Sequence, residues 1–466
     1  MWGSGYMPWP HILSSPLLND RPEPIQEKHC TVKRIKRKLI PLLALASLGN
    51  TPANAAALAD LYRMALENDP QLKAAEARYL SGQEADTQGL AQLLPQISAG
   101  GSYTLSDIGY VDQSTSDRAW QVSLVQPVFD TTKWFSYRKS QLVTEQAALQ
   151  FDLDQQLLIQ RTVNAYLGVL RAMSTLDTAK AQERALKRRL EQVNAQFEVG
   201  VIAITDVQEA QASFDNAVVQ RIDAEGALTN SYEALERLAG QNFTEVDPLR
   251  DDYPIEPVTP TDPSPWLEKA REGNLALKLS ELGIETSRRD SQIARASRHP
   301  KVNLEASYGF SETELSSVPW DESSSVALTL SVPLFTGGNI SSQVRAAEQN
   351  LYAAQYDRED QYREVTEQTR SLLRDLQTSV QSVRARLQSI KSRETALRAT
   401  EEGFNVGTRN VVDVLQAEQA LYQARLDYAT ARLNHISTLF NFKLQLGTLS
   451  PEDLLALDEW LQNASR

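Results

Sequence analysis

The chain is poor in the residues that most often carry out chemistry. Its 466 residues include one cysteine, Cys30, and four histidines. Only His299 and His435 lie beyond residue 55, far apart and without a metal-ligand neighbour. No phosphate-binding glycine loop or nucleophile motif occurs in the sequence. We therefore expect no enzyme activity, no cofactor and no cysteine or histidine metal site.

Positive charge is also scarce. The formal net charge is −13 and the pI is near 5.0, which argues against nucleic acid as a partner. Residues 1–55 carry a net charge of +4, so the rest of the chain carries −17.

The N-terminal segment has the pattern of a secretory signal. Five basic residues between Lys33 and Lys38 precede an apolar stretch, Leu39 to Leu48, that is too short to span a bilayer as a helix. Ala53-Asn54-Ala55 matches a small-residue cleavage site, so we expect residues 1–55 to be removed. Residues 1–31 fit no part of a signal, and initiation at Val32 would give a compact leader. Because Cys30 has no apolar run before it, no lipid anchor is expected.

The remainder of the sequence repeats itself at an offset of 205 to 207 residues, far longer than a solenoid unit. Pro95 corresponds to Pro300, and Gly240 to Gly447. The other matched segments are Gln126-Pro127-Val128-Phe129 with Val332-Pro333-Leu334-Phe335, Phe197-Glu198-Val199-Gly200 with Phe404-Asn405-Val406-Gly407, and Asp206-Val207 with Asp413-Val414. The sequence therefore predicts an internal duplication.

This duplication suggests four parts after the signal. Residues 56–247 form a first repeat, 248–265 a Pro-rich linker, 266–449 a second repeat and 450–466 a C-terminal tail. Each repeat has the same expected order: a helix, two strands, a very long helix, a tight turn and another helix.

Four segments alternate between apolar and polar residues, the period expected of strands with two different faces. They lie at 96–105, 120–125, 302–311 and 326–335. Their lengths and terminal aromatics suit tilted membrane-spanning strands, although a hairpin in a soluble sheet has the same pattern. The stretches Ser106 to Ala119 and Glu312 to Ser325 are expected to be long polar loops. Four strands cannot close a barrel in lipid, whereas three copies would supply twelve.

The rest of the sequence predicts long helices. From Thr131 to Phe197 there is no proline and only one glycine, so a continuous helix there would reach about 100 Å. Coiled-coil spacing is evident in Leu186, Leu190, Val193 and Phe197, and again in Val383, Ile390, Leu397 and Phe404. Such helices need a tubular or rod-like architecture. A soluble periplasmic coiled-coil adaptor without a pore is the main alternative, but it leaves the two pairs of alternating strands unexplained.

With these patterns the sequence resembles the TolC family of outer-membrane efflux and secretion channels over nearly all of 56–461. The segments that carry the resemblance are Phe197 to Gln208, Val406 to Leu415, Thr162 to Tyr166, Val332 to Gly338 and Leu446 to Leu449. The resemblance implies an α+β membrane protein: a homotrimer that shares one twelve-stranded β-barrel in outer-membrane lipid, four strands from each protomer, continued by a long periplasmic α-helical barrel. The linker and the tail would lie in an equatorial belt.

The resemblance also implies a function and partners. The chain would be the exit duct of a tripartite efflux pump or a type I secretion system in a Gram-negative bacterium. It would work with a periplasmic adaptor (membrane fusion) protein and an inner-membrane RND or ABC transporter. The cargo, the adaptor and the pump are not identified by the sequence.

Two helix–turn–helix tips are the candidate docking sites. They consist of Val199, Gly200, Val201, Ile202 and Ala203, and of Val406, Gly407, Thr408, Arg409 and Asn410. In the local interpretation Gly200 and Gly407 end their helices and Asp206 caps the next one. In the functional interpretation, which the resemblance implies, the tips receive the hairpin of an adaptor.

The resemblance places a gate beside these tips. Three copies of Asp413 would form an acidic ring that selects cations and can bind a blocking divalent ion; a solvated helix face would carry such an Asp too. The family's second acid is Gln416 here, and the family's tyrosine partner of Asp206 is Phe404. Arg409 matches the gate arginine that links to Thr205 and Asp206 of the neighbouring hairpin. The substitutions at 416 and 404 predict a looser closed state.

Overall fold

The computed structural model describes residues 57–108, 113–313 and 321–461, so the predicted signal and Cys30 lie outside the described residues. Residues 52–466 form one compact unit. Its first part contains α1 (Leu58–Asn68), α2 (Pro70–Ala91), β1 (Gln96–Ile108), β2 (Gln113–Phe129), α3 (Thr131–Glu198) and α4 (Ile204–Ala239). Its second part contains α5 (Ser264–Gly273), α6 (Leu275–Ala296), β3 (Lys301–Thr313), β4 (Asp321–Ser331), α7 (Asn339–Asn405), α8 (Val411–Gln445) and α9 (Pro451–Asp458).

The described elements show the duplication directly. The run α2-β1-β2-α3-α4 is matched by α6-β3-β4-α7-α8, and the two longest helices have 68 and 67 residues. Four glycines that end helices lie at equivalent places, Gly200 with Gly407 and Gly240 with Gly447, and all four have positive φ between 68° and 78°. A side chain there would be strained, because L-residues rarely adopt this conformation.

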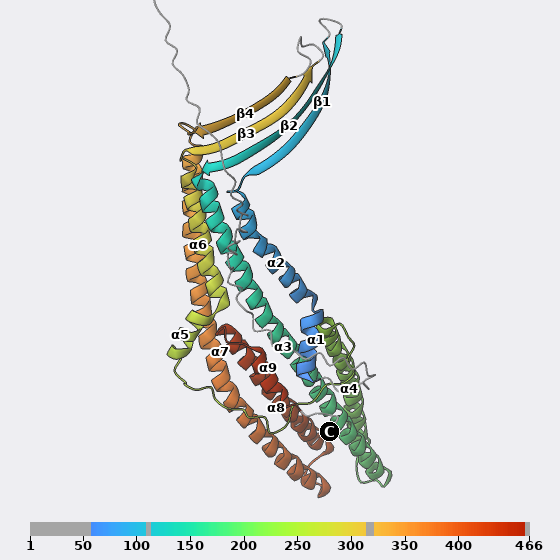
Figure 1. Cartoon of the computed structure of the whole chain (residues 1–466). Helices are drawn as coiled ribbons and strands as arrows, with labels where there is room; N and C mark the ends of the chain where they lie inside the picture. Colours follow the sequence, from blue (N-terminus) through green and yellow to red (C-terminus); the bar gives the residue numbers. More distant parts are fainter. Residues whose placement is uncertain (1–56, 109–112, 314–320, 462–466) are drawn as a thin grey trace, which may run out of the picture. The chain divides into compact units, whose positions relative to one another are not determined.

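The four strands form one antiparallel sheet in the order β1-β2-β3-β4 (Figure 1). Its registers place the apolar residues of all four strands on one face, for example Leu124 beside Ile97 and Ala306. The opposite face carries a row of serines, Ser98, Ser123, Ser307 and Ser325, whose hydroxyls pair at 2.8 Å between β1 and β2 and between β3 and β4. The sheet is therefore two-faced, as the alternation predicts.

Several strand boundaries differ from the sequence prediction. The first expected polar loop was largely wrong, since β1 continues to Ile108 and β2 begins at Gln113, with Ser106 paired to Thr115. The second is strand at both of its ends, because β3 continues to Thr313 and β4 begins at Asp321, and its middle, 314–320, lies outside the described residues. The polar residues of these extensions are backbone-paired strand, because pairing with a neighbour offsets a low strand preference. The fourth strand was predicted to reach Phe335 but ends at Ser331. Pro333 has no N–H for a ladder, and Gly337 and Gly338 turn the chain with φ of 61° and 84°.

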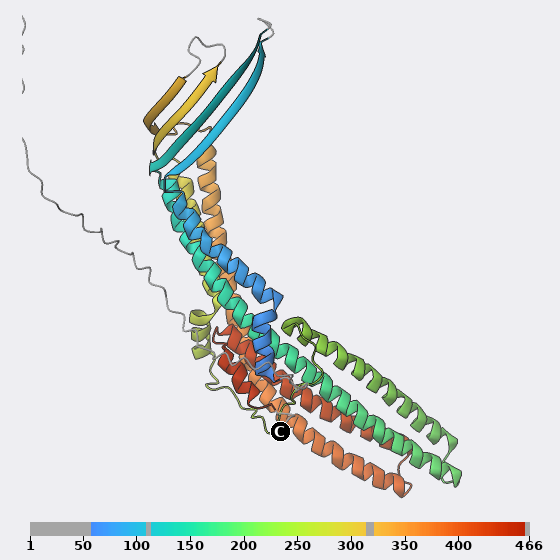
Figure 2. The same ribbon diagram turned by 45° about the vertical axis from the view of Figure 1, so that its right-hand side comes forward.

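The long helices run away from the sheet, side by side (Figures 1 and 2). Next to the sheet they follow the order α2-α3-α6-α7, in which each helix packs on the next. Farther away α3 pairs with α4 and α7 with α8, and α3 also packs on α8. The predicted continuous helix is confirmed by α3, in which Gly168 causes no break.

The largest core of the described residues lies at mid-length, where the first and last described helices, α1 and α9, pack on α3. Leu58 and Leu61 of α1, Tyr166 of α3 and Leu454 of α9 are completely or almost completely buried together there. The segment between the repeats is held against this core, since Tyr166 donates a hydrogen bond of 2.8 Å from Oη to the Asp247 carbonyl. The buried Arg432 contacts the carbonyl of Arg250 and the carboxylate of Asp251. These contacts fix the linker as an ordered strap.

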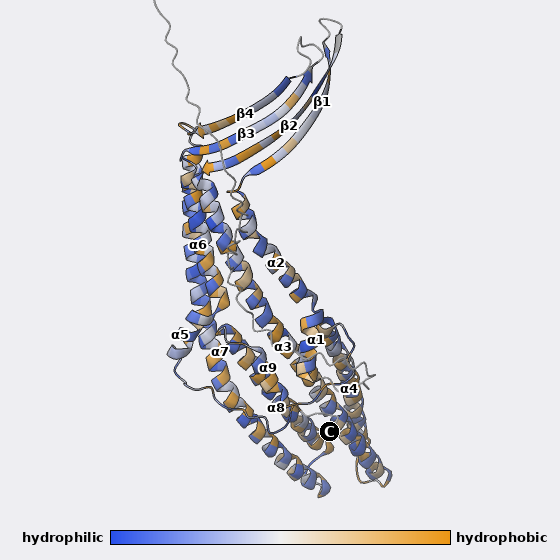
Figure 3. Cartoon of the chain, in the orientation of Figure 1, coloured by the Kyte–Doolittle hydropathy of each residue, from blue (hydrophilic) through white to orange (hydrophobic). Residues whose placement is uncertain are grey.

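Hydropathy along the described helices is mixed, with apolar and polar residues interleaved (Figure 3). Among the described residues, no helix combines the length and the apolar character needed to cross a bilayer.

Candidate functional site

The two hairpin tips are built by the same turn chemistry. At the first tip Gly200 N donates to the Phe197 carbonyl at 2.8 Å, and Val201 N donates to the Gln196 carbonyl at 2.9 Å. At the second, Gly407 N donates to Phe404 and Thr408 N to Gly403, at 3.0 and 2.8 Å. This paired pattern is the Schellman motif, which requires a left-handed residue. The expectation that both glycines end their helices is confirmed.

The helices that follow the turns begin differently. The first residue before α4 is Ala203, which offers no side-chain hydrogen bond, so the prediction that Asp206 caps this helix was wrong. Asp206 lies in the first turn, where its charge favours the helix dipole. In contrast, α8 begins with a capping box: Asn410 Oδ1 accepts from Asp413 N at 2.8 Å, and Asp413 Oδ2 accepts from Asn410 N at 3.3 Å.

An apolar cluster joins all four helices just behind the tips. Its buried members are Leu186, Val193, Ala210, Ala217, Phe404, Val411, Val414 and Leu415, with Leu190 and Leu397 packed against them. Small alanines on α4 at a spacing of seven let it approach α3 closely. Phe197, predicted to continue the seam, is instead 41% exposed because the chain has already begun to turn.

The predicted gate residues gather at this end of the molecule, with different surroundings. Phe404 is buried in the apolar cluster, whereas Gln416 is exposed and lines a cavity of about 450 Å³ between α3, α4 and α8. Arg409 lies 3.8 Å (Nη1 to Oδ2) from Asp413. Within this single copy it makes that ion pair and none with Asp206, and it has no hydrogen bond to Thr205.

A buried ion cluster, which the sequence prediction missed, lies behind the predicted gate residues. Arg189 of α3 donates from Nη2 to Glu401 of α7 at 2.6 Å and to Glu418 of α8 at 3.0 Å. Arg189 and Glu418 are buried, whereas Glu401 is partly exposed. The sequence did contain a signal: Arg189 lies between Leu186 and Val193 in the predicted seam, where a charge needs a partner.

The stability of this cluster depends on the ion pair between Arg189 and Glu418. Burial raises the pKa of the Glu418 carboxyl above its usual range, and the nearby Arg189 guanidinium opposes the shift. Arg189 Nε and Glu418 Oε2 have no hydrogen-bond partner among the described residues. A buried carboxylate with one free oxygen depends on its cation, so the cluster ties the α3/α4 hairpin to the α7/α8 hairpin.

The two histidines have structural partners. His435 is buried, accepts or donates through Nδ1 to the Ser379 hydroxyl at 2.7 Å, and has a pKa lowered by burial. His299 Nδ1 lies 2.9 Å from the Thr131 hydroxyl. Over 57–108, 113–313 and 321–461, no three side chains of His, Cys, Asp or Glu come together as a metal site.

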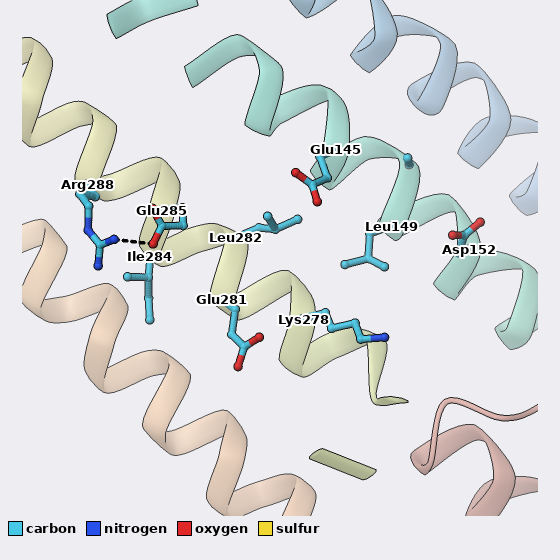
Figure 4. Close-up of a pocket in the computed structure, with 10 residues that line it drawn as sticks. Glu145, Leu149, Asp152, Lys278, Glu281, Leu282, Ile284, Glu285 and Arg288 are labelled. Atoms are coloured by element: carbon cyan, nitrogen blue, oxygen red, sulfur yellow. Dashed lines mark hydrogen bonds and ion pairs between the residues drawn. The ribbon is translucent and has the colours of Figure 1, made fainter. Parts of the chain in front are cut away.

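A cavity lies between α3 and α6 (Figure 4). It measures about 630 Å³ and mixes apolar residues such as Leu149 and Leu282 with charged ones. Two of its carboxylates are engaged, Glu285 by Arg288 at 2.6 Å and Glu281 by Arg358 at 2.8 Å. Its lining contains acids and bases but neither a histidine nor a serine.

Comparison with known proteins gives one consistent result. The family model described as "Outer membrane efflux protein" matches residues 61–241 and 266–448, once in each half. Outer membrane protein TolC of Vibrio cholerae is 33% identical over 92% of this chain and all of its own length. Alkaline protease secretion protein AprF of Pseudomonas aeruginosa is 30% identical, and 86% of each chain is covered.

Solved structures agree on the fold. The outer membrane protein VceC of Vibrio cholerae superimposes with a TM-score of 0.71 at 18% identity, over 84% of this chain and 96% of that one. CusC, whose structures describe transmembrane channel formation, gives a TM-score of 0.74 at 15% identity over 86% and 95%. The adaptor alternative finds no support in these comparisons. The chain functions as a channel, and its location is the outer membrane of Gram-negative bacteria. With its two family-model matches and its full-length similarity to TolC, it belongs to the outer membrane efflux protein family.

Proposed function

We propose that three copies of the chain close into one duct that carries cargo from a periplasm-spanning machine to the cell exterior. The observation that carries this proposal is the open sheet. Among the described strands, β1 and β4 each pair on one side only, yet the sheet has an apolar face. Lipid tolerates no unpaired strand edge, so β1 of one copy would pair with β4 of the next until twelve strands close.

The helical layer supports the same closure. Its outer members are α2, which leads into β1, and α7, which follows β4. Both present exposed apolar or aromatic side chains, Leu80 on α2 and Tyr352 and Tyr356 on α7. Packing α7 of one copy against α2 of the next would cover them and extend the barrel as a tube of helices.

In such a barrel the serine-bearing face would line the pore. The row of Ser98, Ser123, Ser307 and Ser325 would then continue around all three copies as an uncharged, hydrated ring. The apolar face would contact lipid, as in outer-membrane barrels generally.

Mass and conductance test the assembly together. Protein extracted from outer membranes should have the mass of three chains in native mass spectrometry and should form ion-conducting pores in planar bilayers. A single chain without conductance would contradict the proposed trimeric duct.

At the far end, the tips would form the periplasmic entrance. Three copies of Asp413 would create an acidic ring next to a neutral ring of Gln416. In one copy the Asp413 carboxylate is already shared between the Asn410 cap and Arg409, so a blocking divalent cation would compete with both. Asp413→Ala should lower the cation selectivity of the pore, and unchanged selectivity would refute the ring.

Arg409 would have two alternative acidic partners, Asp413 and Asp206. It pairs with Asp413 within its own copy, and in the closed trimer it would link to Thr205 and Asp206 of a neighbouring hairpin. Phe404 has no hydroxyl to offer Asp206, and its ring is buried in the apolar cluster. The buried Arg189 cluster would therefore be the stronger tie between the hairpins, and opening the entrance would break it.

The tips would also receive the partner proteins. Val199, Val201 and Val406 are each at least 70% exposed, an unusual concentration of apolar surface on a turn. A periplasmic adaptor linked to an RND or ABC transporter of the inner membrane would cover them. The names of relatives point to both uses, secretion for AprF and efflux for SepC of Pseudomonas putida. Photo-crosslinkers placed from Val199 to Ala203 should capture the adaptor in cells, whereas crosslinkers at Val219 on α4 should not.

A further inference from the structure

The helix-side end of the sheet is basic on a chain that is otherwise acidic. Ten-residue windows next to this end of each strand cover 86–95, 130–139, 291–300 and 332–341. They contain five Arg or Lys and only two Asp, which are Lys133, Arg138, Lys139, Arg295, Arg298, Asp86 and Asp130. In the adjoining windows farther along each helix, 76–85, 140–149, 281–290 and 342–351, the balance reverses to four Arg and seven Asp or Glu. The net positive charge next to the sheet therefore comes from the start of α3 and from the end of α6 with the turn that follows it, a region that we call the basic band. Both segments adjoin the strands (Figure 1).

Some of these cations have partners within the chain. Lys139 Nζ lies 2.7 Å from Asp290, and Arg295 Nη2 lies 2.7 Å from Glu348. Lys133, Arg138 and Arg298 have no carboxylate within salt-bridge distance among the described residues; Arg298 has a single 3.4 Å contact to the Ser341 hydroxyl. These three side chains are available to an external anion.

The first turn of α3, which carries Lys133, lies beside the turn after α6, which carries Arg298, and Arg138 follows farther along α3. Thr131 at the start of α3 contacts His299, the residue after Arg298, at 2.9 Å. Arg138 lies over the Trp134 ring with 5.2 Å between its guanidinium carbon and the ring centroid. We call Lys133, Trp134, Arg138 and Arg298 the junction patch. It combines an exposed tryptophan with cations, the composition found where membrane proteins cross from acyl chains to headgroups.

Helix electrostatics explains part of the band but not the junction patch. Arg295 lies in the last turn of α6, where the helix dipole favours a cation. Lys133 lies in the first turn of α3, where the dipole disfavours one. A nearby acid, Asp130, is already used to accept hydrogen bonds from the Thr132 and Lys133 amides. The positive charge of Lys133 is therefore unfavourable at the start of α3, and an anion outside the protein would offset this unfavourable interaction.

The neighbouring strand end faces lipid in the proposed barrel. A register shift between Pro127 and Phe129 pairs Phe129 with Val302 and so brings the Phe129 ring to the apolar face. Phe129 is 49% exposed. The basic side chains follow directly after this last apolar row, at the depth where headgroup phosphates lie.

From this placement we infer that the junction patch binds the phosphate of anionic phospholipids in the periplasmic leaflet of the outer membrane. This inference rests on the proposed barrel, which sets the depth of the patch. Lys133 and Arg298 contact the phosphate, with Trp134 beside them, while Arg138, which lies farther along α3 from the strands, interacts with the headgroup on its aqueous side. Three copies would anchor the duct at a fixed height against axial load from its partners.

Lipid selectivity in vesicles tests the inference. The whole protein is reconstituted in phosphatidylcholine vesicles that carry spin-labelled phosphatidylglycerol or spin-labelled phosphatidylcholine, and the motionally restricted fraction of each probe is measured. Phosphatidylglycerol should be preferred about fivefold, equivalent to about 1 kcal/mol. Raised salt should reduce the preference because it screens exposed charges.

Three sets of variants distinguish the patch from general charge. The triple variant K133Q/R138Q/R298Q should bring the preference close to one, and the charge-conserving K133R/R138K/R298K should retain it. The matched control K187Q/K391Q/R398Q removes equal charge from exposed sites on α3 and α7 far from the sheet and should also retain it. Undiminished preference in the first variant, or equal loss in the control, would overturn the inference. Failure of the barrel itself looks different, because then neither lipid probe is restricted.

Discussion

The two hairpin tips make the same backbone turn but carry different side chains. Both turn through a glycine with φ near +75° and close the same pair of backbone hydrogen bonds. The first tip is mostly apolar and its second helix starts at Ala203 without a side-chain cap. The second carries Thr408, Arg409 and Asn410 and starts α8 with a full capping box. Duplication thus preserved the turn and let the surfaces diverge, one toward docking and one toward a charged entrance.

The largest expected effect lies where the two hairpins meet. Arg189→Met should destabilise the tips by about 3 kcal/mol, because it leaves Glu418 buried without its cation. Hydrogen exchange at the first turns of α4 and α8 measures the loss, and pore conductance should rise with it. The double variant R189M/E418M should recover most of the stability, since no buried charge remains. A double variant as unstable as R189M would show that the ion pair is not what holds the hairpins.

The cluster of Arg189, Glu401 and Glu418 also makes the stability of the tips depend on pH, with a smaller effect. Because burial raises the folded-state pKa of Glu418, the folded protein binds more protons than the unfolded chain in the window above the ordinary glutamate pKa. Stability from this group is complete below that window and falls as the pH rises through the raised pKa. The protection factors of the tip amides, which correct for the intrinsic pH dependence of hydrogen exchange, should therefore fall on going from mildly acidic to neutral pH. In Glu418→Gln this part of the dependence should vanish; its persistence would assign it to another group.

Replacing the turn glycine should lower the stability of each hairpin by the same amount. Gly200→Ala and Gly407→Ala should each destabilise their hairpin by about 1.5 kcal/mol, the cost of a left-handed L-residue, since neither new methyl meets another atom. Gly226→Ala is the matched control, because Gly226 lies inside α4 with open space around it and should gain about 0.5–1 kcal/mol. Thermal unfolding and tip hydrogen exchange provide the comparison. Clearly unequal costs would mean that the two turns are not equivalent.

The capping difference has an effect of about 1 kcal/mol at the second tip. Asn410→Ala removes the acceptor for the Asp413 amide and should fray the first turn of α8 by that amount. The backbone amide of residue 410, which donates to the Asp413 carboxylate, is retained in this variant, so the change removes only the side-chain half of the capping box. Amide exchange at Asp413 is the direct readout, and unaltered protection would show that the capping box is not stabilising.

The smallest expected effect is a gain at the first tip. Ala203→Asn introduces an N-cap where none exists and should stabilise the start of α4 by about 0.5 kcal/mol. Hydrogen exchange of the Asp206 amide measures this gain in stability. Lower protection there would indicate that the first tip needs its loose start, for instance to adapt to a partner.

Local rules predicted much of this architecture. An uninterrupted 68-residue helix follows from the absence of proline, and the positive-φ glycines follow from their place after a helical seam. The length of the strands was not predictable in the same way. Ser114 to Asp117 have low strand preference and became strand because β1 lies beside them, which depends on partners distant in the chain.

The site was predictable only where a motif carried it. Arg409 and Asp413 were located by the tip motif, but their mutual contact depends on the Asn410 cap, which draws Asp413 toward its own helix start. Arg189 and Glu418 are 229 residues apart, so only the packing of α3 on α8 reveals that they meet. Charges in an otherwise apolar seam are the signal to follow in similar sequences.

Closure of the sheet between copies is the central claim, and disulfide trapping tests it most directly. Single cysteines along the middle of β1 are combined with a cysteine at Ser325 of β4 in a Cys30→Ser background, and outer membranes are oxidised in place. The intrachain pair at Ser98 and Ser123, whose hydroxyls lie 2.8 Å apart, controls for reactivity. The account predicts that at least one β1–β4 combination gives covalently closed trimers. Efficient bonding of the control pair with no linkage between chains for any combination would contradict it.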